Sequence, residues 1–147
     1  MATDPKLLNS MACFQDLSDD QVNAIAEISN SVCYMKGHVL FEEGSKGELL
    51  YLLIDGDVDI YFKSAESTEN KVDTVSSKEV LGCAALVPPH TYAATEKCLS
   101  DVEVLEINLT DLQDLIQQDP QIGFILQQHI IKTLNDRILT LRHRTYA

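Results

Sequence analysis

The spacing of apolar residues changes twice along this chain, and the change restricts the fold more than any other feature. Apolar residues first recur at the spacing of a helix, then alternate with a period of two from Val32, and return to helical spacing at Leu109. Helix faces and strand faces repeat at different intervals, so these parts cannot share one structure. We therefore predict one domain over residues 1–147, with an N-terminal helical segment (1–31), a β-roll (32–107) and C-terminal helices (108–147).

The middle part predicts several short strands that are joined by tight turns. A buried run at Leu49–Ile54 stops at Asp55–Gly56, and the apolar residues Val58, Ile60 and Phe62 then alternate with more polar ones. This is the pattern of a strand–turn–strand hairpin, and the polar residues 64–71 are expected to form a loop. Short strands repeated at such intervals predict a barrel or a sandwich.

Local signals mark where the predicted helices begin. Ser18–Gln21 has the form of a capping box, in which a hydroxyl precedes a glutamine by three positions. Asn108 or Thr110 can cap the first C-terminal helix. Asp119–Pro120 begins the second one, since proline at the first helical position loses no hydrogen bond. We expect that helix to reach about Arg142.

Composition excludes several classes of function. The chain has 11 basic and 23 acidic residues, for a net charge of −12, so direct contact with nucleic acid is not expected. It contains no apolar run of about 18 residues and no secretory signal, which predicts a cytoplasmic protein with no membrane span. The four cysteines are far apart and form no C-x-x-C motif, so we predict free thiols and no metal or other cofactor.

Four glycines stand at defined places among the predicted strands. They are Gly37 in Lys-Gly-His, Gly44 in Glu-Glu-Gly-Ser, Gly47 before Glu-Leu-Leu-Tyr, and Gly56 in Ile-Asp-Gly-Asp-Val. With the order of helix, strands and helices, this pattern resembles the cyclic nucleotide-binding domain family, which includes the sensor domains of catabolite-activator-like regulators. The resemblance implies a mainly β fold with flanking helices: an eight-stranded antiparallel double-stranded β-helix of jelly-roll type, with N-terminal helices and two C-terminal helices.

Residues 81–95 occupy the place of the family's phosphate-binding cassette. Gly82 allows an unusual backbone conformation and is followed by one predicted helical turn, whose free N–H groups favour an anion. The resemblance makes this segment the ligand pocket. Its candidate residues are Gly82, Cys83, Ala84, Ala85, His90, Tyr92, Ala93, Ala94 and Thr95.

The cassette departs from the family pattern at its two charged positions. In the family a glutamate holds the ribose and an arginine holds the cyclic phosphate, whereas this chain has Cys83 and Tyr92 at those places. His90 and Lys97 are the nearby candidates for a replacement. Each hydrogen bond to a charged group contributes about 1.5–3 kcal/mol. Losing both lowers affinity roughly a hundred- to ten-thousand-fold, so we expect cyclic AMP and cyclic GMP to bind weakly or not at all.

Two further patterns have simpler interpretations than a catalytic or metal site. Asp55, Asp57, Asp59 and Glu66 imitate the spacing of a calcium loop, but Ile60 stands where such a loop needs glycine, which favours a strand. Cys83 and His90 could suggest a nucleophile with its base, or haem ligation as in some family members. No residue is obviously placed to orient the histidine, so a small residue lining a pocket is the preferred interpretation.

The second C-terminal helix is apolar on more than one side. Phe124 and Ile131 lie apart from the main face, while a helix packed on one domain needs a single apolar stripe. The helix therefore either pairs with its copy in a homodimer or covers the mouth of the roll as a lid. Its main face consists of Ile122, Ile125, Leu126, Ile130, Thr133, Leu134 and Ile138.

Three hypotheses follow for the function. The first is a non-enzymatic regulatory module that senses an unknown small ligand. The second is a pseudo-sensor that keeps the fold to dimerise or to bind another protein. The third is an enzyme on a cupin-like roll, and it is disfavoured because such enzymes need a His/Glu metal cluster, which the predicted strands lack. Because the chain ends at Ala147, just after the long helix, we expect any output to pass through another protein or a dimer.

Overall fold

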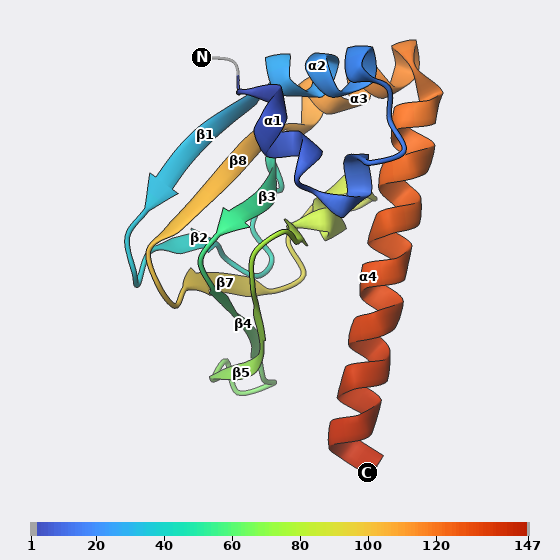
Figure 1. Ribbon diagram of the computed structural model, residues 1–147. Coiled ribbons are helices and arrows are strands. Elements are labelled where there is room, and N and C mark those ends of the chain that lie inside the picture. The colour runs from blue at the N-terminus through green and yellow to red at the C-terminus, as the bar shows by residue number, and fades with distance from the viewer. Residues whose placement is uncertain (1–2, 147) are drawn as a thin grey trace.

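A computed structural model describes residues 3–146 of the chain. Three short helices come first, then eight strands with one 3-10 helix among them, and two helices end the fold (Figure 1). The helices are α1 (Pro5–Asn9), η1 (Ala12–Phe14), α2 (Asp19–Glu27), η2 (Cys83–Leu86), α3 (Leu109–Gln118) and α4 (Pro120–Tyr146). The strands are β1 (Ser29–Tyr34), β2 (Val39–Phe41), β3 (Leu49–Asp55), β4 (Val58–Lys63), β5 (Glu69–Val75), β6 (Val80–Leu81), β7 (Thr95–Cys98) and β8 (Val102–Asn108).

The strands form two four-stranded sheets with antiparallel pairing. One sheet has the order β1-β8-β3-β6 and the other has the order β2-β7-β4-β5. Except for the hairpin of β4 and β5, strands that are adjacent in sequence lie in different sheets, as in a jelly roll. The predicted mainly β fold with flanking helices is therefore confirmed.

The apolar run at the centre of the chain forms β3, which is buried on both faces. Leu50, Leu52 and Leu53 have no exposed surface and belong to one continuous core that also includes Leu8 and Met11 of the N-terminal segment. Alternation cannot be seen in such a strand, because both of its faces are covered. The hairpin predicted after it is wrong: Gly56 does turn the chain into β4, but β3 pairs with β6 and β8 while β4 pairs with β5 and β7 in the other sheet. The turn at Gly56 passes the chain from one sheet to the other, which the alternation of apolar residues within each strand does not reveal.

Three element boundaries differ from the expected ones. The first strand begins at Ser29 and not at Val32, since β1 pairs with β8 over its whole length from Ser29 opposite Ile107. β1 is an edge strand whose outer residues are exposed, so its pattern is weak. The polar segment 64–71 is only partly a loop, because β5 already begins at Glu69. The last helix continues past Arg142 to Tyr146.

The predicted helix caps are present and connect parts of the fold. The Ser18 hydroxyl accepts a hydrogen bond from the Gln21 amide at 3.2 Å, and the Gln21 side chain accepts one from the Ser18 amide at 2.9 Å. The Gln21 amide group also donates to the Asp119 carboxylate at 2.9 Å, which joins α2 to the start of α4. Asn108 caps α3 through the amides of Thr110 and Asp111.

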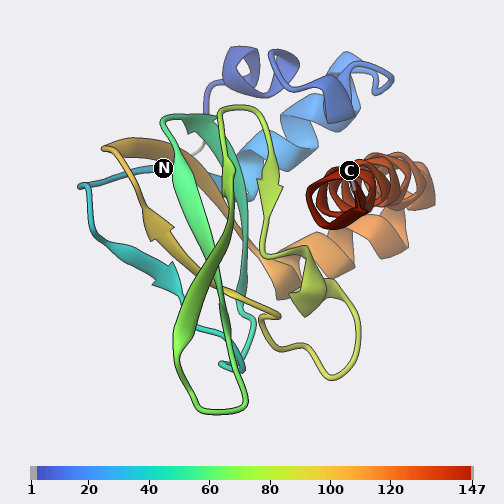
Figure 2. The same ribbon diagram turned by 90° about the horizontal axis from the view of Figure 1, so that it is seen from below.

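Helix α4 runs along one side of the roll, and the view along its axis places it beside α3 (Figures 1 and 2). Ile122, Leu126 and Ile130 are buried in its first half. Farther along, Leu134 and Ile138 are exposed, although both were expected on the packed face. The difference arises because the fold buries apolar side chains only in the first half of this 27-residue helix, while the second half contacts the roll through the charged side chains of Arg137 and Arg144.

The turn glycines provide a test of how closely the backbone packs. Gly37 and Gly56 both have left-handed backbones, with φ of 89° and 99°. A Cβ atom at Gly37 would meet open space, whereas one at Gly56 would lie 2.5 Å from the Asp101 carbonyl oxygen.

We expect Gly37→Ala to destabilise the fold by about 1–2 kcal/mol through strain alone. Gly56→Ala should cost about 1–3 kcal/mol more through overpacking. Urea unfolding of both variants measures this, and equal losses would contradict it.

Candidate functional site

A cavity of about 950 Å³ lies between the β-roll and the C-terminal helices. Its walls come from β4 and β5, the segment 80–87, residues 93–96 and the facing sides of α3 and α4. Most of the lining is apolar, with Phe41, Ile60, Leu126 and Ile130 among the larger side chains. The volume is at the upper end of the range found for small-molecule sites, about 300–1,000 Å³.

Five of the predicted pocket residues line this cavity: Gly82, Cys83, Ala84, Ala93 and Ala94. Gly82 has a left-handed backbone and precedes η2, as the cassette pattern requires. However, η2 is a single 3-10 turn, and the Ala85 amide already bonds to the Gly82 carbonyl. The lining that the cassette contributes is apolar, since Leu81, Leu86 and Val87 join these small residues.

The other predicted pocket residues do not line the cavity, and each has a structural contact. Ala85 is buried against Gly47, where an added Cβ atom would approach it to 2.1 Å. The His90 ring nitrogen Nδ1 lies 2.9 Å from the Ala85 carbonyl oxygen. The Thr95 hydroxyl accepts a hydrogen bond from the Glu43 amide at 2.9 Å. These contacts hold the cassette loop against the turn at residues 44–47.

Tyr92 is locked into the framework at the position that the family gives to arginine. Its ring stacks on Phe41 with centroids 4.1 Å apart, and only 6% of the residue is exposed. The phenol donates to the Leu49 carbonyl oxygen at 2.7 Å and accepts from the Leu49 amide at 3.2 Å. A Cβ atom on Gly82 would lie 3.0 Å from the ring. The side chain thus packs between β2, β3 and the cassette and offers no charge to a ligand.

Glu96 is the most unusual group in the cavity wall. Only 7% of the residue is exposed, and its Oε1 atom has no hydrogen-bond partner among residues 3–146. Burial raises the pKa of this carboxyl from 4.5 to about 7, an effect that Glu79 increases and Arg137 opposes. A buried polar atom without a partner is costly and therefore points to a functional role.

Sequence reasoning missed Glu96, although it directly follows Thr95, the last residue of the predicted pocket. Ala93 and Ala94 lie before β7, which begins at Thr95, and Glu96 lines the cavity with them. Its closeness to the cassette in the sequence was the signal that could have found it. No comparable signal existed for the contribution of α4, because the meeting of a helix and a roll depends on the tertiary structure.

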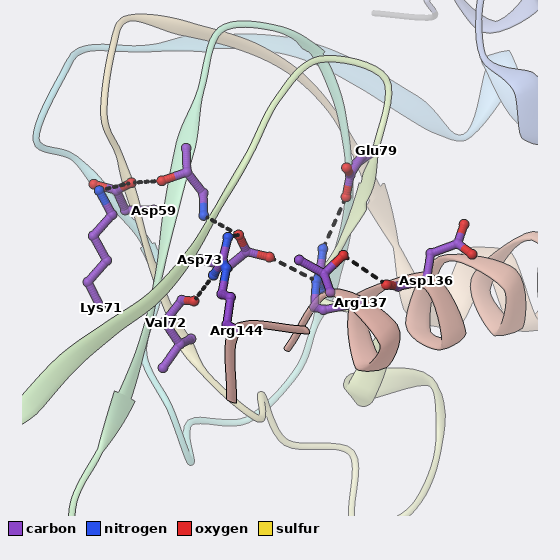
Figure 3. A network of polar contacts seen from close by, with 10 residues as sticks. Asp59, Lys71, Val72, Asp73, Glu79, Asp136, Arg137 and Arg144 are labelled. Carbon is purple, nitrogen blue, oxygen red and sulfur yellow. Dashed lines mark hydrogen bonds and ion pairs between the residues drawn. The ribbon is translucent and has the colours of Figure 1, made fainter. Parts of the chain in front are cut away.

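Ion pairs tie the second half of α4 to the β4–β5 side of the roll (Figure 3). Arg137 lies 3.6 Å from Asp73 and 3.1 Å from Glu79, and Arg144 lies 3.2 Å from Asp73. Arg144 also donates to the Val72 carbonyl oxygen at 2.8 Å. Carboxylates and guanidinium groups alternate in this series of contacts, so the two negative charges of Asp73 and Glu79 balance the two positive charges of the arginines. The contacts hold α4 beside the cavity.

The acidic residues of the calcium-like pattern have other roles. Asp59 lies in β4, is buried, and contacts the ammonium of Lys71 at 3.1 Å and the hydroxyl of Thr74 at 2.6 Å. Within residues 3–146, no group of three or more histidine, cysteine or acidic residues is arranged to hold a metal ion. The predicted strand interpretation of residues 58–62 is confirmed.

Cys83 lacks the environment of a reactive thiol. Burial raises its pKa, an effect that Glu96 increases and Arg137 opposes. The thiolate is the nucleophilic form, so a raised pKa keeps the group inert at neutral pH.

No helix among the described residues is long and apolar enough to cross a membrane.

The raised pKa of Glu96 predicts a pH dependence of stability. The folded carboxyl keeps its proton between pH 4.5 and about 7, while the unfolded one releases it, so rising pH favours the unfolded state. We expect the free energy of unfolding to fall by about 3 kcal/mol from pH 4.5 to pH 8 through this group. Glu96→Gln should remove that part of the slope and stabilise the fold by about 1–3 kcal/mol at pH 8.

Urea unfolding at several pH values measures this effect. Burial also raises the pKa of Glu79, so a smaller slope of the same sign should remain in the Glu96→Gln variant. Glu66→Gln removes a carboxyl from the exposed loop between β4 and β5 and serves as the matched control. An unchanged slope in Glu96→Gln would mean that this carboxyl is not buried in the folded protein.

Comparisons with known proteins agree with this geometry. A family model for the cyclic nucleotide-binding domain matches residues 31–119. The "CRP-like cAMP-activated global transcriptional regulator" of Mycobacterium tuberculosis is 22% identical over 118 residues, which make up 80% of this chain and 53% of that regulator. The chain thus spans about half the length of this curated relative.

Solved structures share the fold. A candidate cyclic nucleotide-binding protein from Geobacter metallireducens GS-15 has a TM-score of 0.80 at 27% identity, covering 92% of this chain and 98% of that one. The catabolite activator protein of Thermus thermophilus has a TM-score of 0.75 at 22% identity, covering 90% of this chain and 62% of that one. With the family model matching more than half of its residues, the chain belongs to the cyclic nucleotide-binding domain family.

Proposed function

We propose that this chain is a non-enzymatic regulatory module in the cytoplasm that senses a small ligand other than cyclic AMP or cyclic GMP. One combined observation supports this proposal most strongly. The protein has a cavity of about 950 Å³, but the position that holds arginine in the family's cassette is filled by the packed side chain of Tyr92. The relatives are regulators by name, which supports a regulatory role. A plugged pocket would have favoured a pseudo-sensor, whereas this cavity is large enough for an organic molecule.

The chemistry of the cavity supports the exclusion of cyclic nucleotides. Tyr92 cannot supply a positive charge, and its ring is held by stacking and by two hydrogen bonds to Leu49. Arg137 lines the cavity, but its guanidinium is paired with Asp73 and Glu79. Glu96 adds a carboxyl to the same wall. A cyclic phosphate would meet no free cation among these groups.

We expect cyclic AMP and cyclic GMP to bind with dissociation constants above roughly 100 µM, because two charged contacts are missing. Isothermal titration calorimetry measures this directly, and a low-micromolar value for either nucleotide would refute the proposal. Cys83→Glu with Tyr92→Arg should raise the affinity while lowering thermal stability, since the stack on Phe41 is lost. Cys83→Glu alone keeps that stack and is the matched control.

A homodimer through α4 has its own support, and it is also the basis of the alternative pseudo-sensor function. Phe124, Ile131 and Ile138 recur at seven-residue intervals and are 61%, 66% and 63% exposed. Apolar residues repeated at this interval form the seam between paired helices. A pseudo-sensor would use this surface alone, to dimerise or to bind another protein, and would leave the cavity without a ligand.

We propose no direct contact with nucleic acid, given the net charge of −12.

The seam predicts a dimer with about twice the 16.4 kDa mass of the chain. Ile131→Glu with Ile138→Glu should give monomers with unchanged circular dichroism, because both residues are exposed. Ile130 is buried, so substituting it would damage the core and test nothing about association. Leu99→Glu alters an exposed leucine between β7 and β8 and is the matched control. Light scattering that finds a wild-type monomer at high concentration would leave α4 as a lid only.

A further inference from the structure

The cavity wall contains one buried acidic group with an unpaired carboxyl oxygen. Glu96 lines the wall, is buried, and leaves Oε1 without a hydrogen-bond partner among residues 3–146. Ala93 and Ala94, which precede β7 and share the lining, are small and carry no donor on their side chains. A donor from outside the chain would satisfy this carboxyl.

The nearby positive charges are already paired. Arg137 contacts Asp73 and Glu79, and Arg144 contacts Asp73, so two guanidinium groups face two carboxylates (Figure 3). That set is neutral by itself. When Glu96 is ionised, it therefore adds a negative charge beside an apolar cavity, where it would repel a second anion.

The geometry points to a ligand class: we propose that the cavity binds a mainly apolar organic molecule that carries a protonated amine, and that its ammonium group pairs with the Glu96 carboxylate. This inference rests on the proposed sensing function and adds the chemistry of the ligand. It concerns Glu96 and the helical wall of the cavity, and not the two cassette positions that bind nucleotides in the family.

The remaining walls suit the apolar body of such a ligand. Phe41, Ile60 and Phe62 contribute from the roll, and Leu126 and Ile130 contribute from α4. The cavity can bury most of a molecule with one or two rings. An ammonium–carboxylate hydrogen bond is charge-assisted and becomes stronger where water is excluded. The amine would thus fix the orientation while the apolar body supplies most of the buried area.

Two probes with the same apolar body separate the head-group preference from simple hydrophobic binding. They are 1-naphthylmethylamine, which is cationic at neutral pH, and 1-naphthylacetate, which is anionic. The chain contains no tryptophan, so naphthalene fluorescence anisotropy can be followed without interference from indole. We expect the wild-type protein to bind the amine at least tenfold more tightly than the acetate. Glu96→Gln should reduce that preference to less than threefold, and the exposed Glu66→Gln should keep it.

Each outcome decides the proposal. Equal binding of the two probes, tighter binding of the acetate, no binding of either, or an unchanged preference in Glu96→Gln would overturn it. If Glu96→Gln fails to fold, the head-group preference of the wild-type protein still decides. The proposed sensing function is tested separately, by calorimetry with cyclic nucleotides and by a thermal-shift screen of cyclic dinucleotides and small metabolites. A metabolite without an amine that stabilises the protein would support sensing while refuting this ligand class.

Discussion

Strand β8 connects the parts of the fold that build the site. It pairs with β1 on one side and with β3 on the other, so the N-terminal and central segments are fixed by the same strand. The chain passes from its last residue, Asn108, directly into α3, which Asn108 caps. The direction in which β8 leaves the sheet therefore decides where α3 and α4 lie, and these helices form one wall of the cavity.

The cavity and the altered cassette have one physical origin. An arginine at position 92 would extend toward a bound phosphate, whereas the phenol of Tyr92 satisfies the backbone of Leu49 and stacks on Phe41. The ring thereby stabilises the contact between β2, β3 and the cassette without any ligand. The space under α4 stays open where the cassette lines it with small side chains, Ala84, Ala93 and Ala94. A family fold is thus retained while the chemistry of its pocket is changed.

Charge has opposite roles on the two sides of this cavity. At the end of α4, carboxylates and guanidinium groups alternate and hold the helix in place. In the wall, Glu96 has no such partner, and its proton is retained toward neutral pH because burial penalises the ionised form. The first arrangement is structural. The second leaves a polar group unsatisfied, which a folded protein tolerates when the group has another use.

The sequence by itself determined the order of elements, the helix caps and the turn at Gly56, although not that this turn joins two different sheets. These features depend on neighbouring residues, through hydrogen bonds of a few positions or through the period of a strand or helix. Glu96 directly follows the predicted pocket residues in the sequence, but the sequence does not show that its carboxyl is buried without a partner. Only the tertiary structure decided that Tyr92 packs inward, that α4 walls the cavity, and that Arg137 and Arg144 pair with Asp73. Those contacts join residues that are far apart in the chain, and whether a charge is paired depends on what folds against it.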